Sequence, residues 1–305
     1  MSANLHPGRE AWAEHGFWTA HRWLIARRLA QLGFLLLFAS GPWLGVWIAK
    51  GTLASSLTLD VLPLTDPLVL LQSLAARHVP ETSALIGVAI VLIAYLTLGG
   101  RLYCSWVCPI NPVTDLAQWT RRRLGLDKGV TLKRTTRHVV LAGVILASAL
   151  TGSIAFELFN PITGLYRALL FGSMLWLVAV LAIFLFDVFV AKHGWCGHIC
   201  PVGAFYGLLN RTAMVRVSAA GRERCDDCMD CYAVCPEMHV ISPALKGAKA
   251  GAGPIVSAAD CTACGRCIDV CPERVFRFTH RFDRRLDPAT VTVRAGATTS
   301  TSRAA

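Results

Sequence analysis

Four long apolar segments constrain the fold of this chain more than any other feature of its sequence. They cover residues 29–49, 84–100, 138–156 and 169–190, and no comparable segment follows them. Each is close to the ~20 residues with which a helix crosses the hydrocarbon core of a bilayer. The chain is 54% hydrophobic and 16% charged, whereas soluble domains average about 25% charged residues. The pattern therefore predicts four transmembrane helices rather than the buried helices of a large soluble protein.

Basic residues are distributed unevenly around these segments, within a net charge of +11. They cluster before the first segment and between the second and third, at Arg9, Arg22, Arg27, Arg28, Arg101, Arg121, Arg122, Arg123, Lys128, Lys133, Arg134 and Arg137. The other two connecting loops carry only Lys50, Arg77 and Arg167. By the positive-inside rule, this bias predicts a multi-pass protein of the bacterial inner membrane with both termini in the cytoplasm. Because the positive charge follows the membrane topology, it argues against a nucleic-acid partner.

The apolar half of the chain is an internal repeat. Asp66-Pro67 follows the first apolar segment, and Asn160-Pro161 follows the third at the corresponding position. An Asx residue before a proline is a helix-start signal, because the side chain caps the helix and proline fits its first position. We expect short helices over residues 69–74 and 163–169, at the periplasmic face.

Each half of the repeat ends in a cysteine pair with the pattern aromatic-Cys-x3-Cys-Pro. The four residues are Cys104, Cys108, Cys196 and Cys200. At this spacing both sulfurs of a pair face one side of a helical turn, so thiols from the two halves can meet. Three interpretations stay open: a third cluster or another soft metal, redox-active dithiols, or reduced cysteines that pack at helix ends.

The remaining eight cysteines form two complete motifs beyond the last apolar segment, Cys225-x2-Cys228-x2-Cys231-x3-Cys235-Pro and Cys261-x2-Cys264-x2-Cys267-x3-Cys271-Pro. This is the spacing of bacterial ferredoxins with two [4Fe-4S] clusters, in which the fourth cysteine of each motif binds the other cluster. One cluster is thus assigned Cys225, Cys228, Cys231 and Cys271, and the other Cys261, Cys264, Cys267 and Cys235. Zinc sites use pairs rather than such triads, and disulfides are disfavoured in the cytoplasm.

The predicted fold is a mainly α membrane protein, with four transmembrane helices in two tandem repeats and a C-terminal α+β ferredoxin-like domain. We expect a cytoplasmic segment at residues 1–28, the membrane domain at 29–210, the ferredoxin domain at 211–286 and a disordered tail at 287–305. Short strands are expected within the ferredoxin domain at residues 240–241, 255–256 and 275–278, and a flexible excursion at 246–253. The sequence indicates no catalytic residue.

Three short sequence segments are also characteristic of a known family, and the likeness to that family covers most of the chain. The segments are residues 63–68 (PLTDPL), 104–109 (CSWVCP) and 193–204 (HGWCGHICPVGA). Together with the cysteine motifs they resemble the NapH family, the quinol dehydrogenase membrane components of periplasmic nitrate reductase systems. The resemblance implies an electron-transfer component rather than a stand-alone enzyme, which takes electrons from quinol within membrane lipid. Its implied partners are a periplasmic multi-cluster ferredoxin of the NapG type and the c-type cytochromes that serve nitrate reductase.

Two other functions fit the same pattern. One is a membrane redox maturation factor that reduces a metal or a disulfide for a partner enzyme. The other is that of the similar ferredoxins of methylamine utilisation.

Overall fold

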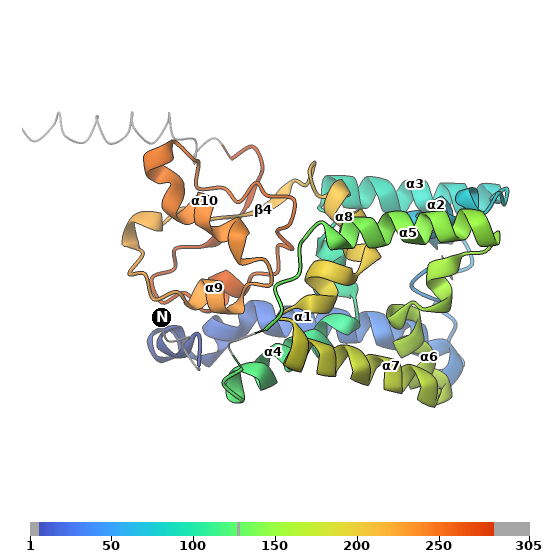
Figure 1. The fold of residues 1–305 in the computed structure, drawn as a ribbon, viewed down its shortest axis with the longest axis horizontal. Coiled ribbons are helices and arrows are strands. Elements are labelled where there is room, and N and C mark those ends of the chain that lie inside the picture. The colour runs from blue at the N-terminus through green and yellow to red at the C-terminus, as the bar shows by residue number, and fades with distance from the viewer. Residues whose placement is uncertain (1–5, 127–128, 284–305) are drawn as a thin grey trace, which may run out of the picture. The chain divides into compact units, whose positions relative to one another are not determined.

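The computed structural model describes residues 6–126 and 129–283 (Figure 1). The described residues divide into two compact units, the first made of residues 6–25 and 211–283 and the second of residues 26–126 and 129–210. The N-terminal residues thus belong to the same unit as the eight C-terminal cysteines, a grouping that the sequence does not indicate. The tail predicted at residues 287–305 lies outside the described residues.

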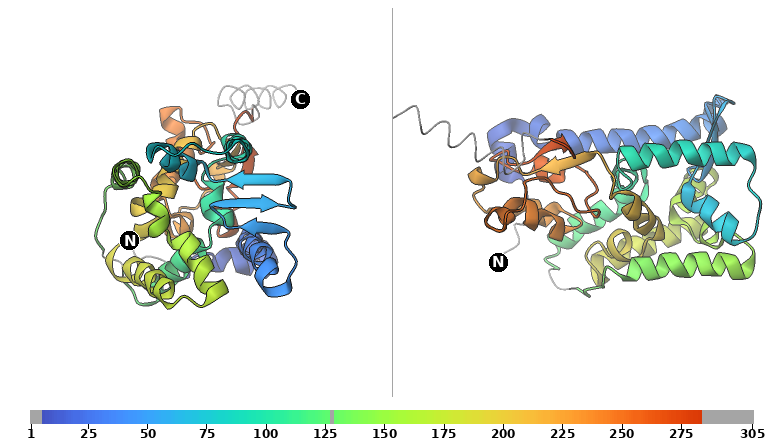
Figure 2. Two further views of the ribbon diagram at one scale, coloured as in Figure 1. Left: turned by 90° about the vertical axis from the view of Figure 1, so that its right-hand side faces the viewer. Right: turned by 90° about the horizontal axis from the view of Figure 1, so that it is seen from above.

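The second unit contains most of the helices. They are the later part of α1 (Arg9–Leu44), α2 (Pro67–Ala75), α3 (Thr82–Thr97), α4 (Ile110–Arg123), α5 (Thr136–Thr151), α6 (Pro161–Phe171), α7 (Met174–Leu185) and α8 (Pro201–Leu209). A small antiparallel sheet in the order β1-β2-β3 lies between α1 and α2 in the chain, with strands at Ala49–Gly51, Ser55–Thr58 and Leu62–Thr65 (Figure 2). The core combines both halves of the repeat, because Leu68, Ile110 and Tyr206 are each almost fully buried in one cluster.

The two Asx-Pro pairs begin helices, as predicted. The Asp66 side chain accepts a hydrogen bond from the Leu68 backbone N–H at 2.7 Å, and α2 begins at the following proline. The Asn160 side chain accepts from the Ile162 backbone N–H at 3.0 Å, and α6 begins in the same way. The two halves of the repeat therefore begin α2 and α6 with the same capping arrangement.

Only part of the four-helix membrane pattern is present as long helices in the described residues. The helix Arg9–Leu44 is long and apolar enough to cross a bilayer, and three shorter apolar helices cover Thr82–Thr97, Thr136–Thr151 and Met174–Val190. At 1.5 Å rise per residue, a 16-residue helix such as α3 spans about 24 Å, less than the ~30 Å of a bilayer core. Four transmembrane helices thus remain a prediction.

The first unit is a small α+β fold around one core. Its elements after residue 211 are β4 (Val215–Ser218), α9 (Asp230–Val234), α10 (Ile241–Lys246), α11 (Arg266–Asp269), β5 (Arg277–His280) and short 3-10 turns. Strands β4 and β5 pair antiparallel, with Val217 opposite Phe278. The strand expected at residues 275–278 overlaps β5, and residue 255 forms a single bridge to Ser218.

One local expectation for this unit is wrong. Residues 240–241 are helical rather than a strand, because a 3-10 turn leads directly into α10, whose first turn accommodates Pro243. The segment 246–253, expected as a flexible excursion, contains a 3-10 turn at Gly247–Ala250 that ends at Gly251 in the left-handed conformation (φ 73°).

Candidate metal centres

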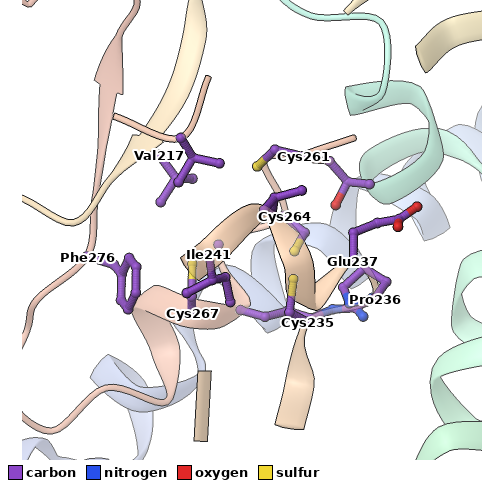
Figure 3. A pocket seen from close by; sticks show the side chains of 14 residues that line it. Val217, Cys235, Pro236, Glu237, Ile241, Cys261, Cys264, Cys267 and Phe276 are labelled. Carbon is purple, nitrogen blue, oxygen red and sulfur yellow. The ribbon is translucent and has the colours of Figure 1, made fainter. Parts of the chain in front are cut away.

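Four cysteine side chains surround a cavity of about 440 Å³ in the first unit (Figure 3). They are Cys235, Cys261, Cys264 and Cys267. The rest of the wall is largely apolar and includes Val217, Ile241 and Phe276. One of these cysteines comes from the first sequence motif and three from the second, which is the combination that the crossed ferredoxin pattern assigns to one cluster.

A second cavity of about 320 Å³ contains the complementary set in its wall. Its cysteines are Cys225, Cys228, Cys231 and Cys271. Tyr232, Leu245 and Val275 supply apolar wall. The structure thus brings all eight residues into two groups of four thiols.

The backbone of both cysteine loops is shaped in the same way. Asp227 and Met229 flank Cys228 with φ of 63° and 67°, and Ala263 and Gly265 flank Cys264 with φ of 45° and 74°. Left-handed conformations are uncommon for residues other than glycine, and they cluster at ligand sites. Alternation of right- and left-handed residues turns backbone N–H groups into a concave anion-binding nest, as found around iron–sulfur clusters. The backbone of these loops, like the four thiols of each cavity, therefore suits an anionic iron–sulfur cluster.

The thiols themselves require a cation before they can act as thiolates. Burial raises the pKa of Cys231 to about 12 and that of Cys228 to about 11. A metal ligand must be the thiolate, and bound iron supplies the charge that stabilises it. Four thiols on apolar walls are a donor set that suits iron–sulfur clusters.

The four remaining cysteines lie in the second unit, at two equivalent π-helical turns. The turns cover Tyr103–Val107 and Trp195–Ile199. In each, the N–H of the second cysteine donates to the aromatic residue that opens the motif, Cys108 to Tyr103 and Cys200 to Trp195, both at 2.9 Å. Isolated π turns are frequent at functional sites.

These turns bring both cysteine pairs into one region of the core. Cys108 and Cys200 are buried in the same cluster, with Cys104 packed against it. The Cys196 thiol, which lies within electrostatic range of the other three, donates to the Thr114 hydroxyl at 3.8 Å. No disulfide joins any of the twelve cysteines, all of which lie in the described residues.

Two buried arginines adjoin this four-thiol group. Arg101 and Arg137 are 2% and 3% exposed. The Arg101 guanidinium lies within electrostatic range of the Cys104 sulfur, and Arg137 Nη1 donates to the Gly197 carbonyl at 3.4 Å. In the sequence, Arg101 and Arg137 are indistinguishable from other basic loop residues at a membrane surface. Their burial could not be predicted, because it depends on packing between the two halves of the repeat.

The comparisons with known proteins agree with this arrangement. A family model described as a 4Fe-4S binding domain matches residues 81–127 and 173–219, which contain the two cysteine pairs of the second unit. Another, described as a 4Fe-4S dicluster domain, matches residues 224–275. The cavities, loops and matches together define a ferredoxin-type iron–sulfur protein of the electron-transfer class.

Similar proteins identify the family within this class. The chain is 49% identical to ferredoxin-type protein NapH of Escherichia coli, over 90% of this chain and 95% of that protein. It is 48% identical to NapH of Haemophilus influenzae, over 90% and 96%. It is also 49% identical to the methylamine utilization ferredoxin-type protein MauN of Paracoccus denitrificans, over 91% and 97%. No solved structure matches the chain. The chain belongs to the NapH family of ferredoxin-type proteins.

Proposed function

We propose that the protein is the membrane electron-transfer subunit of a quinol dehydrogenase that passes electrons from quinol toward periplasmic nitrate reductase. The observation that carries this proposal is the pair of four-thiol cavities in a chain that also presents apolar helices. The proposed partners are membrane lipid and quinol, a periplasmic multi-cluster ferredoxin of the NapG type and c-type cytochromes.

The eight cysteines of the first unit are the proposed ligands of two [4Fe-4S] clusters. Each cluster, when bound, supplies a one-electron carrier. The chain contributes four thiolates, the left-handed loops that direct backbone N–H groups at the site, and apolar walls that limit water. One-electron centres in pairs suit quinol, which gives up two electrons.

Exposed apolar side chains support a place in the bilayer. Met174 and Leu175 at the start of α7 are 73% and 75% exposed, and Leu146 and Leu150 on α5 are 60% and 78% exposed. Water-soluble proteins rarely expose contiguous apolar surface of this kind. We infer an inner-membrane protein with four membrane helices and both termini in the cytoplasm, where α4 ends in Arg121, Arg122 and Arg123.

The four thiols of the second unit are a proposed further redox or metal site. The match of a 4Fe-4S binding model to both halves favours a metal over simple packing. Arg101 and Arg137, both within electrostatic range of Cys104, are cations suited to an anionic centre. We propose that electrons pass through this site on their way from quinol to the ferredoxin clusters.

Iron content and quinol oxidation test the function. Protein purified without oxygen is expected to hold about eight irons for two clusters and about twelve with a third, at four irons per cluster. In vesicles that contain the periplasmic ferredoxin partner, reduced menaquinol or ubiquinol is expected to reduce the clusters in stopped-flow measurements. Near-zero iron with stoichiometric zinc would contradict electron transfer, and loaded clusters that quinol never reduces would contradict the quinol step.

The equally similar MauN relatives favour a second candidate, a ferredoxin-type component of methylamine utilisation. Complementation separates the two. Under the first proposal the gene restores periplasmic nitrate reduction to a strain that lacks NapH, and does not restore growth on methylamine to a strain that lacks MauN. The opposite result favours the second candidate. Restored metal content or disulfide state of a partner enzyme, without quinol oxidation, favours the maturation role.

A further inference from the structure

The N-terminal segment of residues 8–25 is built into the iron–sulfur unit. It belongs to the same compact unit as residues 211–283, although the whole second unit separates them in sequence. Helix α1 is broken within this segment at Gly16, whose φ of 76° and ψ of 164° are not helical. The break divides the segment into two helical parts.

Three sets of hydrogen bonds attach the segment to residues beside cluster cysteines. The Gly8 N–H donates to the Asp230 carboxylate at 2.7 Å, directly before Cys231. His15 Nε2 lies 2.6 Å from the Pro272 carbonyl oxygen, directly after Cys271. The N–H groups of Trp23 and Leu24 lie 3.2 and 2.8 Å from the two oxygens of Asp269, which lies between Cys267 and Cys271 in the chain. The segment therefore contacts both cysteine motifs.

The Trp23 side chain lies against one of the cluster loops. A β-carbon added to Gly265 would lie 2.8 Å from both Cβ and Cγ of Trp23, closer than real contacts allow. The indole also packs edge-on against Phe278, with ring centroids 4.6 Å apart. Gly265 lies in the wall of the cavity that Cys235, Cys261, Cys264 and Cys267 surround. Trp23 thus covers the outer side of the loop whose inner side faces that cavity.

We propose that Trp23 is a positioning residue for the cluster of Cys235, Cys261, Cys264 and Cys267, and that the N-terminal segment is a structural part of the iron–sulfur unit. This inference rests on the proposed clusters. Trp23 holds Gly265 in its left-handed conformation and keeps water from the loop around it. Solvent exposure is among the factors that set the potential of such a cluster, because water stabilises the more negatively charged reduced state.

The test compares Trp23→Ala with Trp23→Phe and with Trp18→Ala in the full-length protein. Trp18 lies on the same segment and is 74% exposed, so its replacement controls for loss of an indole. The readouts are iron per chain, EPR-monitored redox titration and the rate of cluster loss in air. In Trp23→Ala one of the two clusters is expected to titrate at a higher potential and to be lost several-fold faster. Trp23→Phe should restore most of both properties, and Trp18→Ala should match the wild type.

Three other results would overturn this inference, and one of them would overturn the proposed function as well. Equal potentials and loss rates in Trp23→Ala and the wild type, at full iron content, would overturn the inference and leave the proposed function standing. Equal loss of both clusters in Trp23→Ala and in Trp23→Phe would also overturn it, because that pattern reports general unfolding. An iron-free wild-type protein would overturn the proposed function, and this inference with it.

Discussion

The twelve cysteines reach their sites by two different routes in the two units. In the first unit, loops with left-handed residues on both sides of Cys228 and Cys264 wrap the thiols around two cavities. In the second unit, the first cysteine of each pair lies on a π turn and the second directly follows that turn, and the two pairs meet inside a helical core. The first kind of site is encoded in local spacing, whereas the second exists only when two distant halves of the chain pack together.

Serine substitutions should separate the two kinds of site most strongly. Cys231→Ser removes one ligand from a cavity of the first unit, and we expect loss of that cluster, or about half of eight irons. Cys108→Ser should leave these eight irons and both ferredoxin EPR signals intact, and should remove whatever metal the second unit binds. Iron analysis and EPR measure both. If Cys108→Ser changed only the melting temperature, the packing interpretation of the four thiols would be correct.

The same contrast explains what the sequence could predict. The x2-x2-x3 spacing is sufficient to assign eight cysteines to two groups, because each loop is local and the crossed fourth ligand follows from the pattern. The Asx-Pro pairs predict α2 and α6 for the same reason, since a cap and its helix lie within a few residues.

Features that depend on packing were not predictable. Nothing local marks Trp23 as a neighbour of Gly265, because this contact joins residues far apart in sequence. Nothing local marks Arg101 as buried either, because the residue packs against the distant end of α8, where its N–H donates to the Asn210 side chain at 3.4 Å. The strands of β1–β3 are three or four residues long and carry no clear alternation. The close contact at Gly265 is with the Trp23 side chain.

Glycine substitutions should test how far the second site depends on the contact between halves. A β-carbon at Gly100 would lie 2.2 Å from the Tyr206 carbonyl oxygen of α8, so Gly100→Ala must push the first cysteine turn away from α8. Overpacking of this kind costs about 1–3 kcal/mol. We expect a lower melting temperature in detergent and loss of metal from the second unit, with both ferredoxin clusters retained.

The matched control is Gly143→Ala on α5, where no atom lies within 4 Å of the added carbon. Alanine is favoured over glycine within a helix by about 1 kcal/mol, so this variant should be slightly more stable than the wild type. Retention of all metal by Gly100→Ala, at lowered stability, would show that the four thiols do not need this contact between the halves.

The smallest expected effects compare the two halves of the second unit at their helix caps. Asp66→Ala and Asn160→Ala each remove one side-chain cap, which typically stabilises by about 1 kcal/mol. Asp66 also interacts electrostatically with Tyr206, whereas Asn160 donates to Glu157 at 2.7 Å and to Thr163 at 3.1 Å. Because Tyr206 belongs to α8 of the other half and Glu157 and Thr163 are local, Asp66→Ala should reduce metal binding by the four thiols more than Asn160→Ala does. Thermal unfolding and metal content measure the two effects, and equal metal loss in both variants would contradict a special contact between the halves at Asp66.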